Sequence, residues 1–364
     1  MSALFEPITL RSLTIPNRVW LSPMCMYSAA PEGPETGVAT DFHLAHLGAR
    51  AAGGAGLVMV EATGVRPDAR ISPWDLGLWN DRQQEALARV AALIRSHGSV
   101  PAIQLAHAGR KASTAKAGLG GGPLAVEDGG WPVVGASPIP FKDGYPTPVE
   151  LTEAQIAELV EDFASAARRA LAAGFQVVEV HGAHGYLVHQ FLSPLTNHRT
   201  DGYGGDFAGR SRLAREITAA VRAVWPADLP VLFRVSATDW VADEPSWTVE
   251  ESALLAKELQ AIGVDLVDVS SGGLVPDAKI VVGPGYQVPF AAQIREQSGV
   301  PVSTVGAITE PAHAEKILAD GDADVVMLGR EMLRDPYWPL HAAKALGAER
   351  NWPEQYGYAV GDRG

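Results

Sequence analysis

Cysteine is nearly absent from this 364-residue chain, in which Cys25 stands alone. A single cysteine excludes an intramolecular disulfide, a zinc site built on several thiolates and a cysteine-ligated iron–sulfur cluster. The chain also lacks an apolar run of membrane-spanning length, and its N-terminus lacks the charged-then-apolar pattern of a signal peptide. We therefore predict a cytoplasmic protein that has no membrane partner.

Basic residues are fewer than acidic ones. The chain has 29 Lys and Arg but 42 Asp and Glu, which gives a formal net charge of −13. Such a balance disfavours a nucleic-acid partner, although an acidic surface can still surround a local basic pocket. The 47% hydrophobic and 20% charged residues are typical of a globular protein. No linker or break in composition divides the chain, so we predict one domain over residues 1–364.

Short apolar runs recur along the chain and predict buried strands. They occupy residues 19–21, 57–60, 102–105, 177–180, 231–235, 266–269, 302–305 and 325–328. The segments between them have helical periodicity, and Thr152 with Gln155 and Thr248 with Glu251 are typical of helix N-caps. Alternating strands and helices favour an α/β protein built as a parallel (β/α)8 TIM barrel. A doubly wound open sheet is the alternative.

Three segments fall outside this alternation. Residues 8–15 alternate apolar and polar side chains around a turn, which predicts a β-hairpin before the barrel. Residues 108–149, after the third strand, are crowded with glycine and proline, so we expect a long lid loop over the barrel mouth or a subunit contact. Residues 346–364 form a C-terminal tail.

Polar side chains gather where the fourth strand ends. His181, His184 and Tyr186 follow the apolar run directly. A helical turn there would point both imidazoles at one spot, with the phenol approaching from another direction. Two donors could hold a substrate oxygen while the phenol delivers a proton. The alternative is that the histidines satisfy backbone groups and the tyrosine only packs.

The ends of the other strands also carry polar or glycine-rich sequence. Arg234 needs either a bound electron-rich group or a structural carboxylate, because a buried guanidinium keeps its charge. The Gln104 amide can donate and accept hydrogen bonds, which suits the edge of a ring that does both. The alternative is that it satisfies hydrogen-bonding groups of the core. Cys25 is either a small buried hydrophobe or a modulator of a redox cofactor. The ends of strands seven and eight, Gly306-Ala307 and Gly329-Arg330, are typical of phosphate-binding loops.

Several motifs together resemble the Old Yellow Enzyme family of FMN-dependent ene-reductases, in its bacterial thermophilic-like branch. They are Ser-Pro-Met-Cys-Met-Tyr-Ser at 22–28, His-Gly-Ala-His-Gly-Tyr at 181–186, Gln-Phe-Leu-Ser-Pro at 190–194, Tyr-Gly-Gly at 203–205 and Leu-Gly-Arg at 328–330. The resemblance extends from residue 4 to about residue 340. Residues 206–210 and His198 depart from the family pattern, and both lie outside the expected site.

The resemblance implies FMN as the bound cofactor, NADPH or NADH as the electron donor, and a role for each matching residue. Tyr186 would protonate the substrate, His181 and His184 would bind its activating oxygen, and Tyr27 would help it to bind. The flavin would contact Ser22, Pro23, Met24, Cys25, Ala62, Gln104 and Arg234, with its phosphate held by Gly306, Ala307, Gly329 and Arg330.

The implied reaction is a ping-pong reduction of the activated C=C bond of α,β-unsaturated carbonyl or nitro compounds. Hydride would come from flavin N5 and the proton from Tyr186. A homodimer or homotetramer is expected, in which Arg350 or Trp352 enters a neighbouring subunit's pocket or stays in a solvated tail.

Two other function classes stay open at this point. A flavin-free barrel lyase or aldolase acting on a phosphorylated substrate could use the same phosphate-binding loops. It would need a Schiff-base lysine or a metal cluster at the strand ends, and the sequence indicates neither. A non-catalytic binding module would not need an arginine, two histidines and a tyrosine at one barrel mouth.

Overall fold

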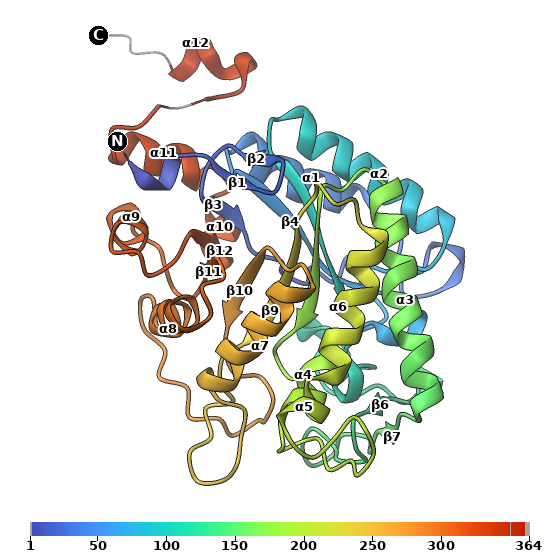
Figure 1. The fold of residues 1–364 in the computed structure, drawn as a ribbon. Helices are drawn as coiled ribbons and strands as arrows, with labels where there is room; N and C mark the ends of the chain where they lie inside the picture. The colour runs from blue at the N-terminus through green and yellow to red at the C-terminus, as the bar shows by residue number, and fades with distance from the viewer. Residues whose placement is uncertain (1, 350, 361–364) are drawn as a thin grey trace.

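The apolar runs form a closed parallel barrel in the computed structural model, which describes residues 2–349 and 351–360 (Figure 1). This confirms the TIM barrel and excludes the doubly wound sheet. Most of the strands extend a few residues beyond the predicted apolar runs. The barrel strands are β3 (Val19–Leu21), β4 (Leu57–Gly64), β5 (Val100–Ala106), β8 (Val177–Gly182), β9 (Val231–Ser236), β10 (Leu266–Ser270), β11 (Val302–Thr304) and β12 (Val325–Leu328).

A helix follows each barrel strand and packs on the outside of the barrel (Figure 1). The outer helices are α1 (Asp41–Ala52), α2 (Asp81–Ser96), α3 (Glu153–Ala172), α6 (Arg212–Val224), α7 (Val249–Ile262), α8 (Val288–Ser298), α9 (Pro311–Ala319) and α11 (Trp338–Ala345). The short helices α4 (Leu187–Leu192), α5 (Phe207–Arg210), α10 (Arg330–Arg334) and α12 (Gly357–Val360) lie in the connections and in the tail.

The predicted N-caps start the helices where the sequence places them. Thr152 Oγ1 accepts the Gln155 N–H at 3.3 Å, and Gln155 Oε1 accepts the Thr152 N–H at 3.0 Å, so both ends of a capping box are present at α3. Thr248 Oγ1 likewise accepts the Glu251 N–H at 3.2 Å at the start of α7. These helices set the spacing of the strands that carry the site.

The hairpin predicted at residues 8–15 closes the barrel end at which the strands begin. It consists of β1 (Ile8–Leu10) and β2 (Leu13–Ile15), with Ile8 opposite Ile15. Leu10 and Ile15 are buried, and they belong to the apolar cluster that fills the barrel interior together with Trp20, Leu57 and Met59. The opposite end of the barrel is therefore the end open to a ligand.

The loop predicted at residues 108–149 lies at that opposite end, where β6 (Val134–Gly135) pairs with β7 (Val149–Glu150) (Figure 1). The loop is tied to the barrel mouth, because the Arg110 guanidinium donates to the Leu274 carbonyl, beyond β10, at 2.7 Å. This placement agrees with the predicted position of a lid, whereas its opening and closing stay a prediction.

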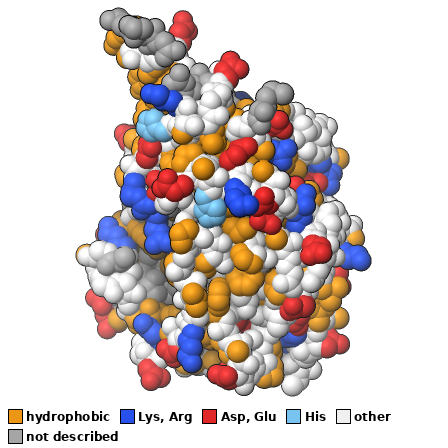
Figure 2. Space-filling view, turned by 90° about the vertical axis from the view of Figure 1, so that its left-hand side faces the viewer, with side chains coloured by type: hydrophobic (Ala, Val, Ile, Leu, Met, Phe, Trp, Pro, Cys, Tyr) orange, Lys and Arg blue, Asp and Glu red, His pale blue; other side chains and the backbone are white. Residues whose placement is uncertain are grey.

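The surface seen in Figure 2 interleaves acidic and basic side chains, so neither sign forms a continuous field on that face. No helix within residues 2–349 and 351–360 combines the length and apolar composition of a membrane span. In the tail, Trp352 stacks on Tyr337 of the same chain with ring centroids 5.7 Å apart, and Arg350 lies outside the described residues. Assembly and cytoplasmic location stay predictions.

The hairpin generates a stability prediction. Ile15→Ala should lower the free energy of unfolding by about 2–5 kcal/mol, because it leaves a cavity in the barrel interior. Thr14→Ala, at the exposed neighbouring position of the same strand, is the control and should cost under about 1 kcal/mol. Urea unfolding followed by tryptophan fluorescence measures both, and equal effects of the two changes would show that the hairpin does not support the barrel.

Candidate active site

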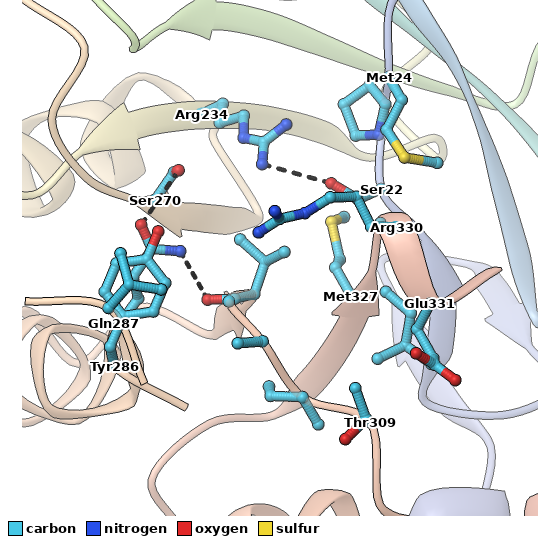
Figure 3. A pocket seen from close by; sticks show the side chains of 18 of the residues that line it. Ser22, Met24, Arg234, Ser270, Tyr286, Gln287, Thr309, Met327, Arg330 and Glu331 are labelled. Atoms are coloured by element: carbon cyan, nitrogen blue, oxygen red, sulfur yellow. Dashed lines mark hydrogen bonds between the residues drawn. The ribbon is translucent and has the colours of Figure 1, made fainter. Parts of the chain in front are cut away.

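A cavity of about 580 Å³ opens at the carboxyl ends of the barrel strands (Figure 3). Its size is within the range of small-molecule and cofactor sites. Predicted site residues from five of the eight strand ends line it, and they are Ser22, Pro23, Met24, His184, Arg234, Gly306, Ala307, Gly329 and Arg330. Cys25, Tyr27, Ala62, Gln104, His181 and Tyr186 do not line this cavity and occupy neighbouring positions at the mouth.

One end of the cavity has the features of an anion site. Gly306 has φ +131°, and a Cβ there would lie 2.8 Å from the Tyr286 ring, so only glycine fits. Gly329 precedes α10, and the Arg330 side chain points into the cavity (Figure 3). Exposed backbone N–H groups beside a guanidinium suit a phosphate group.

Arg234 lies at the centre of the cavity wall, near the end of β9 (Figure 3). Its Nε is 2.9 Å from Oδ2 of Asp268 on β10, and its Nη2 donates to Ser22 Oγ at 3.3 Å. The structural ion pair that the sequence left open is therefore present. Because the same guanidinium also lines the cavity, the pair fixes the cation in place for a bound electron-rich group.

A second buried carboxyl lies beside this pair. Glu179 on β8 accepts a hydrogen bond from Gln104 Nε2 at 2.7 Å. Burial, and then the charge of Asp268, raise the pKa of Glu179 to about 8. Burial also raises the pKa of Asp268, but Arg234 and a 2.8 Å hydrogen bond from Ser303 stabilise its ionised form. At neutral pH, Asp268 therefore carries the charge and Glu179 carries a proton.

The two imidazoles come together, but not through the helical turn that we predicted. His181 is still in β8, His184 has φ +60°, and α4 begins only at Leu187. The prediction failed because Gly182 continues the strand and Gly185 also has a positive φ. The rings nevertheless meet, with His181 Nε2 3.4 Å from His184 Nδ1.

The backbone defines the tautomer of His181. Its Nδ1 accepts the Ala183 N–H at 3.2 Å, so a neutral ring carries its proton on Nε2. Burial, and then the charge of Arg234, lower the pKa of both imidazoles well below the usual value, so both are neutral at neutral pH. His184 Nε2 lies 2.7 Å from Ser270 Oγ, and the serine hydroxyl can either donate or accept there.

Tyr186 lies over the imidazole pair, with its ring centroid 5.2 Å from that of His181. Burial raises the pKa of its phenol well above 10, so the proton is in place at neutral pH. Of the non-glycine residues with positive φ in the described chain, Tyr27, His184 and Ala307 belong to the predicted site. Strained backbone of this kind clusters at functional sites.

Lys111 is a site residue that the sequence analysis missed. Its Nζ donates to the carbonyls of His184 at 2.7 Å and Gly273 at 2.8 Å, and it lies 5.1 Å from the centre of the Tyr186 ring. Burial, and then Arg110, lower the pKa of Lys111 to about 7. The lid loop, and not a strand end, brings this lysine to the mouth.

Glu179, Asp268 and Gln287 were also missed. Glu179 and Asp268 could have been found, because each is a lone carboxylate inside an otherwise apolar strand. Gln287 gave no such signal. Its Nε2 donates to the Val305 carbonyl at 2.6 Å, which turns its Oε1 toward Ser270 and Ser271.

The chain is similar to known proteins in sequence and in structure. Residues 3–349 match the model of the NADH:flavin oxidoreductase / NADH oxidase family. An NADPH dehydrogenase of Listeria monocytogenes is 48% identical over 359 residues, covering 99% of both chains. The structure of morphinone reductase is similar at 30% identity with a TM-score of 0.78, covering 97% of this chain and 92% of that one. An old yellow enzyme homologue from Zymomonas mobilis, 26% identical, also gives a TM-score of 0.78, with 96% and 94% coverage.

Lys111 generates a pH-dependent prediction. Its pKa in the folded protein, about 7, is below the value of 10.5 for a free lysine side chain, so between these values the unfolded chain binds more protons. Stability should therefore rise with pH in this interval, and Lys111→Met should abolish that contribution. From about pH 7 to about pH 10, the melting temperature of the wild type should rise relative to that of Lys111→Met.

Lys142→Met, at an exposed position of the same loop, controls for the loss of a lysine. A gap between the wild type and Lys111→Met that stays constant over the whole interval would contradict a depressed pKa at Lys111.

Proposed function

Because the chain belongs to the NADH:flavin oxidoreductase / NADH oxidase family, we propose that it reduces the activated C=C bond of small α,β-unsaturated carbonyl or nitro compounds. Its cofactors are FMN and NAD(P)H. The observation that carries the proposal is a pair of neutral imidazoles beside a protonated phenol, at the mouth of a cavity with a fixed cation. This set can bind an oxygen that gains charge and can protonate carbon.

The cavity fits FMN in size and in the placement of charge. The anion site formed by Gly306, Ala307, Gly329 and Arg330 would hold the phosphate, and Arg234 would face the edge of the ring system that becomes electron-rich. When bound, FMN supplies the two-electron transfer between the nicotinamide and the alkene.

The remaining contacts to the ring system would come from the ends of the first three strands. Ser22, Pro23 and Met24 line the cavity wall, and Cys25 and Ala62 lie next to them. Gln104 Nε2 donates to Glu179, and the amide oxygen would be the atom available to the ring edge. Gln104 would thus donate a hydrogen bond to Glu179 and accept one from the cofactor.

The imidazoles would bind the substrate oxygen through their N–H groups. His181 presents Nε2–H, as fixed by the Ala183 N–H at Nδ1. His184 carries its proton on Nδ1, so that the two N–H groups converge, when the Ser270 hydroxyl donates to His184 Nε2 rather than to Gln287 Oε1, which lies 3.4 Å from Ser270 Oγ. Without a ligand, the two N–H groups would point at each other and repel. A substrate oxygen between them would accept a hydrogen bond from each. Such donors stabilise charge that develops on the oxygen.

Tyr186 would be the proton donor to the α-carbon. Its O–H bond breaks as the new C–H bond forms, which leaves a phenolate. The Lys111 ammonium, 5.1 Å from the centre of the phenol ring, stabilises that phenolate. Tyr27, half-buried and with φ +52°, stands at the mouth and would contact the other side of the substrate.

Lys111 also bears on the flavin-free lyase or aldolase. A buried lysine with a depressed pKa is the type of residue that forms a Schiff base. Here the Nζ is held by two backbone carbonyls, which leaves it poorly placed to attack a substrate carbonyl. Together with the family assignment, this contact argues against the rival.

Replacing the proposed acid should separate the two half-reactions. Tyr186→Phe should slow reduction of an enone by the reduced enzyme about 10²–10⁴-fold, the usual contribution of a general acid. Reduction of the flavin by NADPH needs no such proton and should change little. Anaerobic stopped-flow absorbance of the flavin measures both rates.

Tyr358→Phe, which removes a hydroxyl from an exposed tyrosine in the tail, is the matched control and should change neither rate. Equal rates of enone reduction in Tyr186→Phe and the wild type, for several enones, would remove the proton-donor assignment.

A further inference from the structure

The only cysteine of the chain lies in a cluster with two buried carboxyl groups. Cys25 Sγ and carboxylate oxygens of Glu61 and Asp75 all lie within 4.8 Å of one another. Glu61 is 4% exposed and Asp75 is 1% exposed. The three residues come from the end of β3, from β4 and from the connection between β4 and α2. None of them lines the large cavity, so the mechanism above leaves the two carboxyl groups without a role.

A break in the strand pairing aims Glu61 into this cluster. The register of β4 against β5 shifts between Val60 and Thr63, so Glu61 and Ala62 are left out of the pairing. Irregularities of this kind redirect side chains at barrel rims. Glu61 would otherwise continue the alternation of the strand.

Groups that can donate hydrogen bonds lie beside both oxygens of the Glu61 carboxyl group. Its Oε2 accepts the Met26 N–H at 2.9 Å, and its Oε1 is 3.4 Å from His43 Nε2. His43 Nδ1 accepts the Thr40 N–H at 2.9 Å, so a neutral His43 carries its proton on Nε2, facing Glu61. Two donors therefore face the Glu61 carboxylate.

Asp75 is placed differently. Its Oδ2 accepts the Ser72 N–H at 2.5 Å, whereas its Oδ1 is buried and has no hydrogen-bond partner. An ionised carboxylate in that position would leave an oxygen unsatisfied next to the charge of Glu61, which is costly. Burial, and then the charge of Glu61, raise the pKa of Asp75 to about 7. A proton on Oδ1 removes the charge from this unpartnered oxygen.

No cation in direct contact removes the need for that proton. The nearest guanidinium, that of Arg70, donates to the carbonyls of Pro67 at 2.9 Å and Pro73 at 2.7 Å. Arg234 is committed to Asp268. Besides these, Tyr27, Tyr186 and His43 are the titratable groups that face the cluster, and burial raises the pKa of both phenols, which keeps them neutral at neutral pH.

We propose that Asp75 is a positioning residue for Cys25: Asp75 holds a proton beside the Glu61 carboxyl group at neutral pH, and the two carboxyl groups keep the sulfur a neutral thiol. The effect on the flavin rests on the proposed site, in which Cys25 lies against the ring system. When the proton on Asp75 leaves, the added negative charge disfavours electron uptake by the flavin. The pair thereby makes the flavin potential sensitive to pH around neutrality.

Asp75→Asn tests the proposal, because an asparagine retains the acceptor for Ser72 and imitates the protonated acid. The holoenzyme is alkylated with iodoacetamide over a range of alkaline pH, and mass spectrometry reads the single cysteine. Removing one neighbouring negative charge should raise the alkylation rate about tenfold, the equivalent of one pKa unit. Burial and the two carboxylates raise the pKa of the wild-type thiol, so its rate should be low.

Asp68→Asn, which removes a half-exposed aspartate in the same connection, is the matched control and should leave the rate unchanged. Glu61→Gln is the second variant and should also accelerate alkylation, which keeps the test valid if Asp75→Asn folds poorly. Identical pH profiles of the wild type, Asp75→Asn and Glu61→Gln would overturn the proposal.

The flavin potential tests the connection to the cofactor. Between about pH 6 and pH 8 the midpoint potential should fall more steeply with pH in the wild type than in Asp75→Asn. If Asp75 acts through the thiol, Asp75→Asn should change the slope of potential against pH less when Cys25 is also replaced by alanine. A faster alkylation with an unchanged potential would overturn the role toward the cofactor. Loss of enone reduction in other variants would bear only on the proposed function, since neither readout uses an alkene.

Discussion

The ion pair between Arg234 and Asp268 is the interaction on which the site depends. A guanidinium cannot shed its charge on burial, so the barrel interior must supply a counter-ion, and Asp268 does so at 2.9 Å. Removing one partner of such a pair usually costs about 3–5 kcal/mol. The neighbouring Glu179 is then left to hold a proton. The result is a cation in a fixed position under the cavity, with no surplus charge in the barrel.

This fixed cation reinforces the effect of burial on the protonation of the groups above it. Burial is the main reason that His181 and His184 are neutral, and Arg234 is the second. Neutral imidazoles are donors whose tautomers can be set by the Ala183 N–H on one side and the Ser270 hydroxyl on the other. At the far side of the mouth, Glu61 and Asp75 form a separate acidic pair around Cys25. For Glu179, His181 and His184, burial and a charged neighbour together explain the direction of the pKa shift.

The sequence was sufficient for the barrel because the relevant signals are local. Apolar runs, capping pairs such as Thr152 with Gln155, and glycines at strand ends depend only on neighbouring residues. Family motifs and strand ends also located nine of the residues that line the cavity, among them Arg234 and Arg330. The path of the chain between His181 and Tyr186 was not predictable, because a left-handed conformation at a histidine is imposed by tertiary contacts such as the Lys111 clamp.

Contacts between distant segments account for the rest of what the sequence did not reveal. Lys111 reaches the mouth only through the folding of the lid loop, and Asp75 meets Glu61 only through a register shift in β4. Both residues look like ordinary surface charges in the sequence. Their burial, which changes their chemistry, is a property of the assembled barrel end.

The protonation of the two imidazoles offers the most direct test of this account. Nitrogen-15 NMR of histidine-labelled, FMN-loaded protein, assigned with His181→Asn and His184→Asn, reads the charge and the tautomer of each ring. Both rings should stay neutral from about pH 5.5 to about pH 8, and His181 should carry its proton on Nε2. An imidazolium signal from either ring near its ordinary pKa, or a His181 protonated on Nδ1, would contradict the account.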